Sequence, residues 1–212
     1  MTVTTTTLQT DAPLALPLGT TPEGTPVSWQ LLDAAGQTEH GVITGRRGCG
    51  GTTALARLAT QARAAGVHTV QVDLDGGPAW AAAAHRITTA AQLETGLAQL
   101  THTRDTAPTL VLVDGHRALV ERREAWEELL IASRAQGVAV VARLHSLATA
   151  HSGGSLVRSL LLSSGQYAAL GACLDLATPA VLPGYREPAA WPHTGSGVYG
   201  HSGQTTQLTV TA

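Results

Sequence analysis

The fold is decided by residues 40–53, which read His40-Gly41-Val42-Ile43-Thr44-Gly45-Arg46-Arg47-Gly48-Cys49-Gly50-Gly51-Thr52-Thr53 and continue into Ala54-Leu55-Ala56-Arg57-Leu58-Ala59. The apolar run from Val42 to Thr44 is typical of a short buried strand, and the alanine-rich continuation is typical of a helix. The glycines between them allow a tight turn. The stretch therefore predicts a strand, a glycine-rich turn and a helix in immediate succession.

This order is that of a P-loop, in which backbone N–H groups at the start of a helix surround phosphate groups. The P-loop pattern is G-x-x-x-x-G-K-[ST]. Gly45, Gly50 and Thr52 fall in register with it, but the lysine position is Gly51. All 13 basic residues of the chain are arginine, so no lysine elsewhere can replace the missing one. The sequence keeps the scaffold of a nucleotide site and lacks its main cation.

The composition limits the class of protein. A net charge of -2 argues against a surface built for general binding of the nucleic-acid backbone, although it leaves room for a local basic patch. The two cysteines, Cys49 and Cys173, form no disulfide framework and indicate a reducing compartment. No apolar run approaches the about 20 residues of a membrane helix, and the first residues do not resemble a signal peptide. We therefore expect a cytoplasmic protein without membrane insertion.

Alternating strand and helix patterns predict an α/β fold with a mainly parallel sheet and helices on both faces. A hairpin is expected at each end of the chain. Residues 1–11, rich in threonine, are expected to form an edge strand or a tail, and residues 12–212 a single domain. Strands are expected at 14–18, 27–31, 42–44, 67–72, 109–113, 138–144, 167–170, 198–200 and 207–211, helices at 52–64, 78–85, 88–101, 122–134 and 156–162, and a proline-rich surface loop at 175–194.

Several further motifs appear in an order that is specific when taken together. They are Val72-Asp73-Leu74-Asp75-Gly76-Gly77, Leu112-Val113-Asp114, Ser133-Arg134-Ala135-Gln136-Gly137-Val138 and Gly195-Ser196-Gly197-Val198-Tyr199. With the P-loop, they resemble the "IDLKGG" motif, the Walker B strand, the "GRAAGI" motif and the closing hairpin of the FtsK/SpoIIIE DNA translocase motor domains. The chain looks most like the actinobacterial branch that includes the plasmid-transfer TraB proteins. The resemblance implies a RecA-like fold, ATP with Mg²⁺ as cofactor, oligomeric assembly with related motor subunits, and double-stranded DNA as a candidate partner.

The sequence departs from that family at the positions that carry its chemistry. The Walker A lysine position is Gly51, and the Walker B glutamate position, directly after Asp114, is Gly115. The family's sensor pair falls at Leu144-His145, and the arginine expected after Ser163-Ser164 is absent. The lysine of "IDLKGG" is replaced by Asp75, which reverses its charge.

The degenerate P-loop is the first candidate site, since a phosphate cradle needs only backbone N–H groups. Productive ATP binding is a weaker expectation, because charge-assisted contacts of about 1.5–3 kcal/mol each are missing with the lysine. Arg46 and Arg47 could supply charge from the loop, and Cys49 is either a small loop residue or a reactive thiol. The alternative is an inherited turn kept for packing. The candidate nucleotide- or anion-binding residues are Gly45, Arg46, Arg47, Gly48, Cys49, Gly50, Gly51, Thr52 and Thr53.

Two positions outside the loop complete the candidate site. Asp114 is the Walker B-like residue, and with Thr52 it could hold Mg²⁺; the alternative is a polar residue that ends a buried strand. His145 is the sensor-like residue, and it and His116 could stand in for missing polar groups. No catalytic residue and no dedicated metal site are predicted from the sequence.

Three functions are consistent with these patterns. The combined losses favour a catalytically silent pseudo-ATPase, acting as a structural or regulatory subunit of a DNA-transfer or secretion assembly. The alternative is an active ATP-dependent translocase of double-stranded DNA whose divergent site is completed by a neighbouring subunit. The third is a binding module whose altered pocket receives a partner peptide, similar to the degenerate ATPase domains of EccC-type secretion motors.

Overall fold

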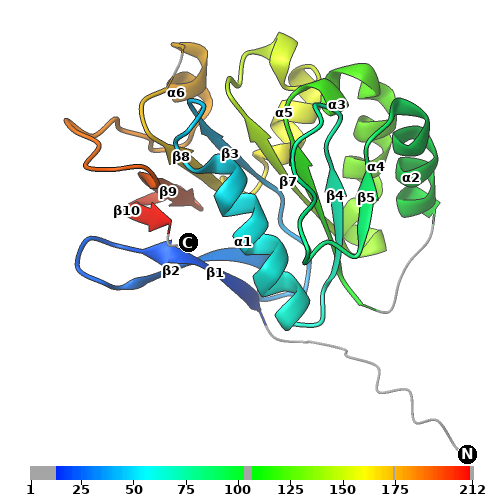
Figure 1. Ribbon diagram of the computed structural model, residues 1–212, viewed down its shortest axis with the longest axis horizontal. Coiled ribbons are helices and arrows are strands. Elements are labelled where there is room, and N and C mark those ends of the chain that lie inside the picture. Colours follow the sequence, from blue (N-terminus) through cyan, green and yellow to red (C-terminus); the bar gives the residue numbers. More distant parts are fainter. Residues whose placement is uncertain (1–12, 103–106, 174, 211–212) are drawn as a thin grey trace, which may run out of the picture.

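The computed structural model describes residues 13–102, 107–173 and 175–210, whose strands form one ten-stranded sheet (Figure 1). The strand order is β2-β1-β10-β9-β8-β3-β7-β6-β4-β5. Strands β8 to β5 of this order are mutually parallel, and the predicted α/β fold with a mainly parallel sheet is confirmed. The parallel strands are β8 (Tyr167–Leu170), β3 (Gly41–Gly45), β7 (Val138–Leu144), β6 (Thr109–Asp114), β4 (His68–Val72) and β5 (His85–Ile87).

The two predicted hairpins are present and extend this sheet. They are β1 (Leu14–Thr20) with β2 (Pro26–Leu32), and β9 (Ser196–His201) with β10 (Gln204–Val210). β9 joins the parallel part by pairing antiparallel with β8, and β1 joins β10 through Gly19 opposite Val210. The N-terminal hairpin β1–β2 and the C-terminal hairpin β9–β10 therefore form one antiparallel extension of the sheet. The predicted N-terminal strand or tail at 1–11 lies outside the described residues.

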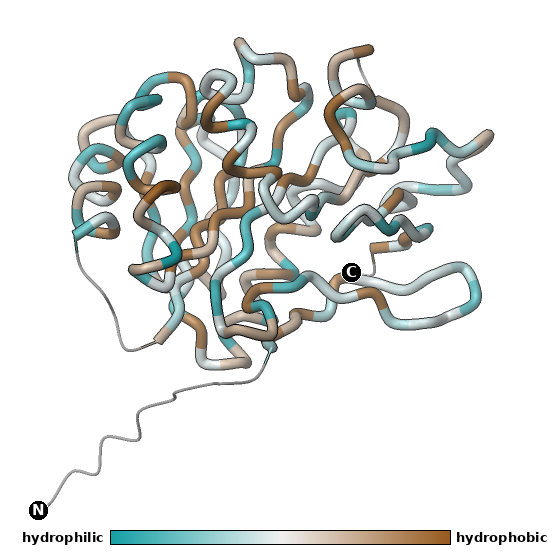
Figure 2. Tube along the Cα trace, turned by 180° about the vertical axis from the view of Figure 1, so that it is seen from behind, coloured by the Kyte–Doolittle hydropathy of each residue, from teal (hydrophilic) through white to brown (hydrophobic). Residues whose placement is uncertain are grey.

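Helices cover both faces, as predicted. Successive residues of β6 alternate: Leu110 and Leu112 share an apolar cluster with α1 (Gly51–Ala64), whereas Val111 and Val113 belong to the cluster on the opposite face. Figure 1 shows α1 in front of the sheet, and Figure 2 shows the apolar strands between the layers. Burying a leucine such as Leu55 fully contributes about 2 kcal/mol, so α1 is held by its apolar face. The opposite face carries α2 (Ala90–His102), α3 (Arg117–Glu121), α4 (Arg123–Gln136) and α5 (Ser155–Leu161).

One predicted element is wrong, because tertiary hydrogen bonds override the helix propensity of alanine. Residues 78–85 form no helix but run along β4, tied to its side chains. The Gln71 amide donates to the Pro78 carbonyl (2.9 Å) and accepts from the Trp80 N–H (3.0 Å), and the Thr69 hydroxyl donates to the Ala82 carbonyl (2.9 Å). This segment leads into β5, which the sequence patterns did not predict. The short elements α3, η1 (Thr149–His151) and α6 (Ala177–Val181) were also not predicted.

A buried histidine anchors the strand that carries the loop. His40 directly precedes β3; its Nδ1 accepts from the Val140 N–H (3.0 Å) and its Nε2 lies 2.8 Å from the Ser133 hydroxyl, which donates to the Leu130 carbonyl (2.7 Å). Because Nδ1 accepts, the ring is neutral with its proton on Nε2. Burial, and secondarily the charge of Arg134, lower the pKa of His40 to about 4. His40 thereby ties β3 to β7 and α4.

Candidate functional site

The loop between β3 and α1 has the backbone of a tight phosphate cradle. Gly45, Gly48 and Gly50 have φ values of 146°, 80° and 95°, a region that side-chain-bearing residues rarely adopt. At Gly45 there is also no space for a side chain, since a Cβ would lie 2.0 Å from the Leu170 carbonyl oxygen. The local sequence therefore requires glycine here for both conformation and clearance.

The start of α1 presents hydrogen-bond donors without acceptors in the helix. The first helical bond runs from the Ala54 N–H to the Gly50 carbonyl (2.8 Å), so the N–H groups of Gly51, Thr52 and Thr53 precede it. No side chain caps this end, and no acidic residue stands in the first turn. The positive end of the helix dipole adds to these donors. The arrangement suits an anion.

A cavity of about 570 Å³ opens over this loop, within the usual range for small-molecule sites. Every predicted loop residue and His145 line it, and Arg46 and Arg47 are exposed there. Thr44, at the floor, is 2% exposed, and its hydroxyl has no hydrogen-bond partner among the described residues. A buried hydroxyl without a partner is costly unless water or a ligand supplies one. The further lining residues are Asp75, Gly115, His116, Arg143, Leu170 and Thr194.

Cys49, the one sulfur among the loop residues, packs against the chain that follows β8. It is half-buried, and its Sγ lies 2.6 Å from where a Cβ on Gly171 would be. Gly171 follows β8 and has a φ of 68°, so the close approach of the sulfur depends on glycine there. The interpretation of Cys49 as a small loop residue fits this packing better than that of a reactive thiol.

A polar network joins the two ends of the loop to the ends of β6 and β7. The Thr52 hydroxyl donates to Asp114 Oδ2 (3.2 Å), and Arg143 Nε donates to Asp114 Oδ1. Arg143 Nη1 lies 3.0 Å from His145 Nε2, and His145 Nδ1 lies 2.9 Å from the Gly45 carbonyl oxygen. Arginine only donates and a carbonyl only accepts, so His145 is the neutral Nδ1–H tautomer. Both predicted residues outside the loop, Asp114 and His145, therefore contact it through this network.

Arg143 lines the cavity, although the sequence patterns did not predict it as a site residue. It lies in β7, where it pairs with Ile43 on one side and Asp114 on the other. A Cβ on Gly51 would lie 2.8 Å from Arg143 Cδ and 3.1 Å from its Cγ. The arginine side chain thus occupies the space beside the lysine position of the P-loop. The available signal was a single charge within the otherwise apolar run 138–144.

Asp75 lies beside Gly115, the position of the Walker B glutamate, as Arg143 lies beside Gly51. A Cβ on Gly115 would lie 2.4 Å from Asp75 Oδ2, and Gly115 has a φ of 104°. The neighbouring Asp73 is 2% exposed, accepts from the Asp75 N–H (2.9 Å) and forms an ion pair with Arg86 (3.4 Å). Asp73 therefore shapes the turn, and Asp75 is the carboxylate that lines the cavity.

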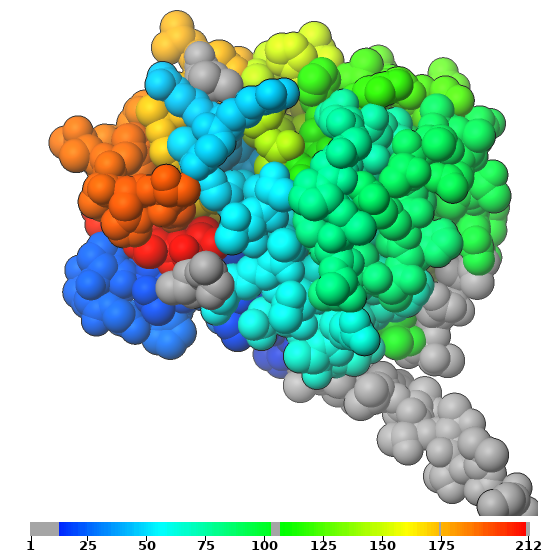
Figure 3. Space-filling view, in the orientation of Figure 1, coloured from blue at the N-terminus to red at the C-terminus, as the bar shows by residue number. Residues whose placement is uncertain are grey.

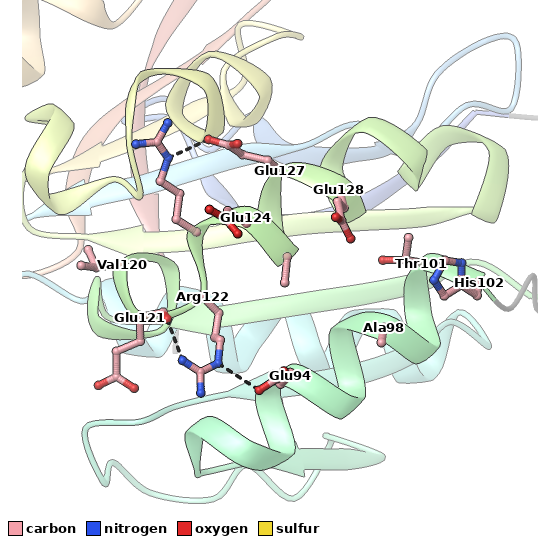
Figure 4. A pocket seen from close by; sticks show the side chains of 12 residues that line it. Glu94, Ala98, Thr101, His102, Val120, Glu121, Arg122, Glu124, Glu127 and Glu128 are labelled. Atoms are coloured by element: carbon pink, nitrogen blue, oxygen red, sulfur yellow. Dashed lines mark hydrogen bonds and ion pairs between the residues drawn. The ribbon is translucent and has the colours of Figure 1, made fainter.

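A second groove, among the described residues and larger than the loop cavity, is a poor phosphate site. Figure 4 shows this groove of about 950 Å³, where two ion pairs hold the side chains, Arg122 with Glu94 (3.5 Å) and Arg123 with Glu127 (2.8 Å). Its glutamates would repel a polyphosphate. The loop cavity is the better candidate for nucleotide. The glutamates that line the groove are Glu94, Glu121, Glu124, Glu127 and Glu128.

Two further questions are whether the described residues could hold a metal ion and whether any of their helices could cross a membrane. No group of three or more His, Cys, Asp or Glu side chains in the described ranges is arranged to hold a metal ion, so Mg²⁺ would depend on Thr52, Asp114 and the phosphates it accompanies. The unpartnered Thr44 hydroxyl and the pair formed by Thr52 and Asp114 fit a Mg²⁺–polyphosphate ligand. Within 13–102, 107–173 and 175–210, no helix has the length and apolarity needed to cross a bilayer.

The sequence matches no protein-family model and no curated protein. Among solved structures, the chain is similar to the pCW3 conjugation coupling protein TcpA in its monomer form with ATPγS (TM-score 0.73, 12% identity, 95% of this chain and 66% of that one). It is similar to VirB4 of Thermoanaerobacter pseudethanolicus (0.68, 11%, 95% and 97%). It is also similar to ATPases 2 and 3 of Thermomonospora curvata EccC in complex with a signal sequence peptide (0.59, 16%, 92% and 40%). The chain thus spans less than two thirds of TcpA and of EccC, and its fold is that of the P-loop ATPases of conjugation and secretion.

Proposed function

We propose that this chain binds a nucleoside triphosphate with Mg²⁺ in the loop cavity, as a motor-domain homologue in a DNA-transfer or secretion assembly. The observation that carries the proposal is the cradle itself. The start of α1, with three N–H groups that have no acceptor in the helix, lines one cavity with Thr44, whose buried hydroxyl has no partner among the described residues, and with Thr52, which is paired with Asp114. The conjugation coupling protein TcpA, which is similar in fold, was solved with ATPγS, but at 12% identity the proposal rests on the cradle and not on that ligand.

Each group has a distinct part in this binding. The N–H groups of residues 51–53 would donate to phosphate oxygens, which the helix dipole also favours. Thr52 and Asp114 would hold Mg²⁺, which neutralises phosphate charge when bound. Arg46 and Arg47, exposed at the cavity, would add attraction for the polyphosphate. Since a P-loop without its lysine retains these groups, binding does not depend on the lost side chain alone.

The pseudo-ATPase hypothesis and the active-translocase hypothesis differ in whether the bound nucleotide is hydrolysed. Catalytic silence is favoured by the loss of lysine, glutamate and arginine at their usual positions. Two of these gaps, at Gly51 and Gly115, are however occupied by Arg143 and Asp75, which favours the alternative of an active, divergent ATPase. Oligomerisation with related motor subunits, contact with double-stranded DNA and a cytoplasmic location remain parts of this proposal.

The peptide-binding hypothesis has less support in the cavity. EccC was solved with a signal sequence peptide, but at 16% identity this says nothing of the ligand of the present chain. The cavity over the loop is lined mainly by glycine, threonine, arginine and histidine. Such a lining provides hydrogen bonds and positive charge, whereas peptide grooves rely on apolar pockets.

Calorimetry with a nucleotide that turns over slowly tests the proposal. ATPγS is titrated into the full chain with Mg²⁺, and into the Thr52→Val and Thr60→Val variants. Thr52→Val should weaken Mg²⁺-dependent binding by about tenfold, since it removes a hydroxyl at the metal. Thr60 lies in the same helix, is exposed and does not line the cavity, so Thr60→Val is the matched control and should bind normally. An absence of binding by the unmodified chain at any concentration would end the proposal.

A further inference from the structure

At Gly51 and Gly115, which replace the Walker A lysine and the Walker B glutamate, neighbouring side chains fill the space that a side chain would need. A side chain at Gly51 would collide with Arg143, and one at Gly115 with Asp75. We propose that Arg143 and Asp75 perform the parts of the absent lysine and glutamate, so that this cavity hydrolyses nucleoside triphosphate within one chain. The inference rests on the proposed nucleotide binding and adds the reaction and the residues that carry it.

The position of Arg143 suits a phosphate contact. Its backbone is fixed in β7 between β3 and β6, so its side chain emerges between the loop strand and the strand that ends at Asp114. The guanidinium uses Nε for Asp114 and one Nη1 hydrogen for His145, and Nη2 has no partner among the described residues. Arg143 lines the same cavity as the residues of the loop, so these remaining donors are available to a ligand there. Arginine is well suited to bind phosphate through paired N–H groups.

Gly51 and Arg143 depend on each other. The atoms that a Cβ at Gly51 would meet are Cδ and Cγ of Arg143, in the middle of the side chain rather than at its flexible end. A lysine at residue 51 and the observed arginine therefore cannot both occupy this space. The side chain of Arg143 therefore requires glycine at residue 51, and the positive charge is supplied by the adjacent strand β7 instead of the loop.

The position of Asp75 in the lining of the same cavity suits a base. Its main chain is held by the bond from its N–H to Asp73 Oδ1, and Asp73 is itself paired with Arg86. The Asp75 side chain is exposed in the cavity, and its carboxylate accepts no hydrogen bond from any described residue. It is therefore available to accept one from water. Its oxygen lies beside Gly115, where the glutamate that follows Asp114 would begin.

The reaction that this arrangement supports is displacement by water at the γ-phosphorus. The water oxygen forms the new bond to phosphorus, the bond from phosphorus to the β–γ bridging oxygen breaks, and the electron pair stays on the diphosphate. Asp75 accepts the proton that the water loses. Arg143 stabilises the charge on the phosphoryl oxygens, and exchanges its contact with Asp114 for one with phosphate. The products are nucleoside diphosphate and inorganic phosphate.

The base is tested by phosphate release and ATPγS affinity measured side by side, with and without duplex DNA. Asp75→Asn should lower phosphate release by about 100-fold or more, as expected for loss of a general base, and should leave ATPγS affinity within twofold. Glu124→Gln, which neutralises a carboxylate in the acidic groove of Figure 4, is the control and should change neither. Turnover that is unaffected by Asp75→Asn overturns the role of Asp75.

The role of the Arg143 charge is tested by returning a positive charge to residue 51. Arg143→Leu should weaken ATPγS binding about 10- to 100-fold, Gly51→Lys alone should not strengthen it, and the double variant should recover most of the loss. Arg143→Lys keeps a charge and tests the role even where Arg143→Leu folds poorly; it should retain more affinity than Arg143→Leu. Equal affinities in all four variants overturn the role of Arg143. Normal ATPγS binding without any turnover overturns only the hydrolysis, whereas no binding at all overturns the proposed function itself.

Discussion

Replacing His40 should remove a defined part of the acid sensitivity of this fold. The ring accepts a hydrogen bond from the Val140 N–H through Nδ1, so a proton on that atom breaks the bond. It would also place a charge in a buried site near Arg134, and these effects lower the pKa of His40 to about 4. His40→Gln cannot take up this proton, although it costs some packing at every pH.

The sign and size follow from the two pKa values. The unfolded chain, with a histidine pKa near 6.5, binds the proton before the folded chain does, so acid favours unfolding. The contribution of neutral His40 is complete above pH 6.5 and is lost progressively as the pH falls from 6.5 towards 4. The free energy of unfolding should decline by about 1.4 kcal/mol per pH unit inside this window. Between pH 7 and pH 5, the loss due to His40 is about 2 kcal/mol.

Urea unfolding at pH 7, 6 and 5, followed by the fluorescence of the buried Trp29 and Trp126, measures this loss. The unmodified chain should lose about 2 kcal/mol more than His40→Gln over that range, because all other titrations are common to both. His68→Gln, at an exposed histidine, is the control and should follow the unmodified chain. Parallel pH profiles for the unmodified chain and His40→Gln would show that His40 titrates normally in the folded state.

Three further outcomes are expected. Gly45→Ala should lower the free energy of unfolding by about 3 kcal/mol and abolish ATPγS binding in calorimetry, because the added Cβ would lie 2.0 Å from the Leu170 carbonyl oxygen at a φ of 146°. Gly66→Ala is the control: its Cβ would have no neighbour within 4 Å, and the substitution should cost about 1 kcal/mol in urea unfolding. Thr44→Val should stabilise the chain slightly, by up to about 1 kcal/mol, since it removes an unpartnered buried hydroxyl, while it weakens ATPγS binding; unchanged affinity would show that this hydroxyl serves no ligand. Removing Mg²⁺ with EDTA should weaken ATPγS binding in the unmodified chain but have little further effect in Asp114→Asn, and an equal EDTA effect in both would exclude Asp114 from the metal site.

The parallel strands were predictable because their burial is complete. Val138–Leu144 and Tyr167–Leu170 have the predicted bounds, since strands covered on both faces are almost continuously apolar and glycines flank them. The failure at residues 78–85 has the opposite cause. Alanine favours a helix, but Thr69 and Gln71 on β4 hold this segment in an irregular path with a turn through their hydrogen bonds. Those partners lie in another element, so local propensity does not reveal them.

The candidate site could be predicted from the sequence only where its residues occupy positions of a known motif. Comparison with the motifs gave the loop, Asp114 and His145 as candidates. Arg143 and Asp75 enter the cavity from β7 and from the turn after β4, and they become neighbours of Gly51 and Gly115 through the sheet register alone. In Figure 3, α1 lies in the middle of the front face, where segments distant in sequence converge.

A lost signature residue indicates lost chemistry only if nothing else reaches the same place, and the three losses differ in this respect. Gly51 and Gly115 border on Arg143 and Asp75, so their losses are open to compensation within the chain. The arginine expected after Ser163-Ser164 is a separate case. Gln166, Tyr167, Ala168 and Ala169 stand in that stretch, and all four are buried. The register of β8 places Ala168 beside Ile43 and Ala169 beside Thr44, at the end of β3 that leads into the loop. The polar side chains of this stretch hold the sheet together: the Tyr167 hydroxyl donates to the Pro183 carbonyl (3.0 Å), and the Gln166 amide donates to the Gln30 carbonyl (2.9 Å). The compensation proposed for this cavity therefore concerns Gly51 and Gly115 alone, and the lost arginine is not part of it.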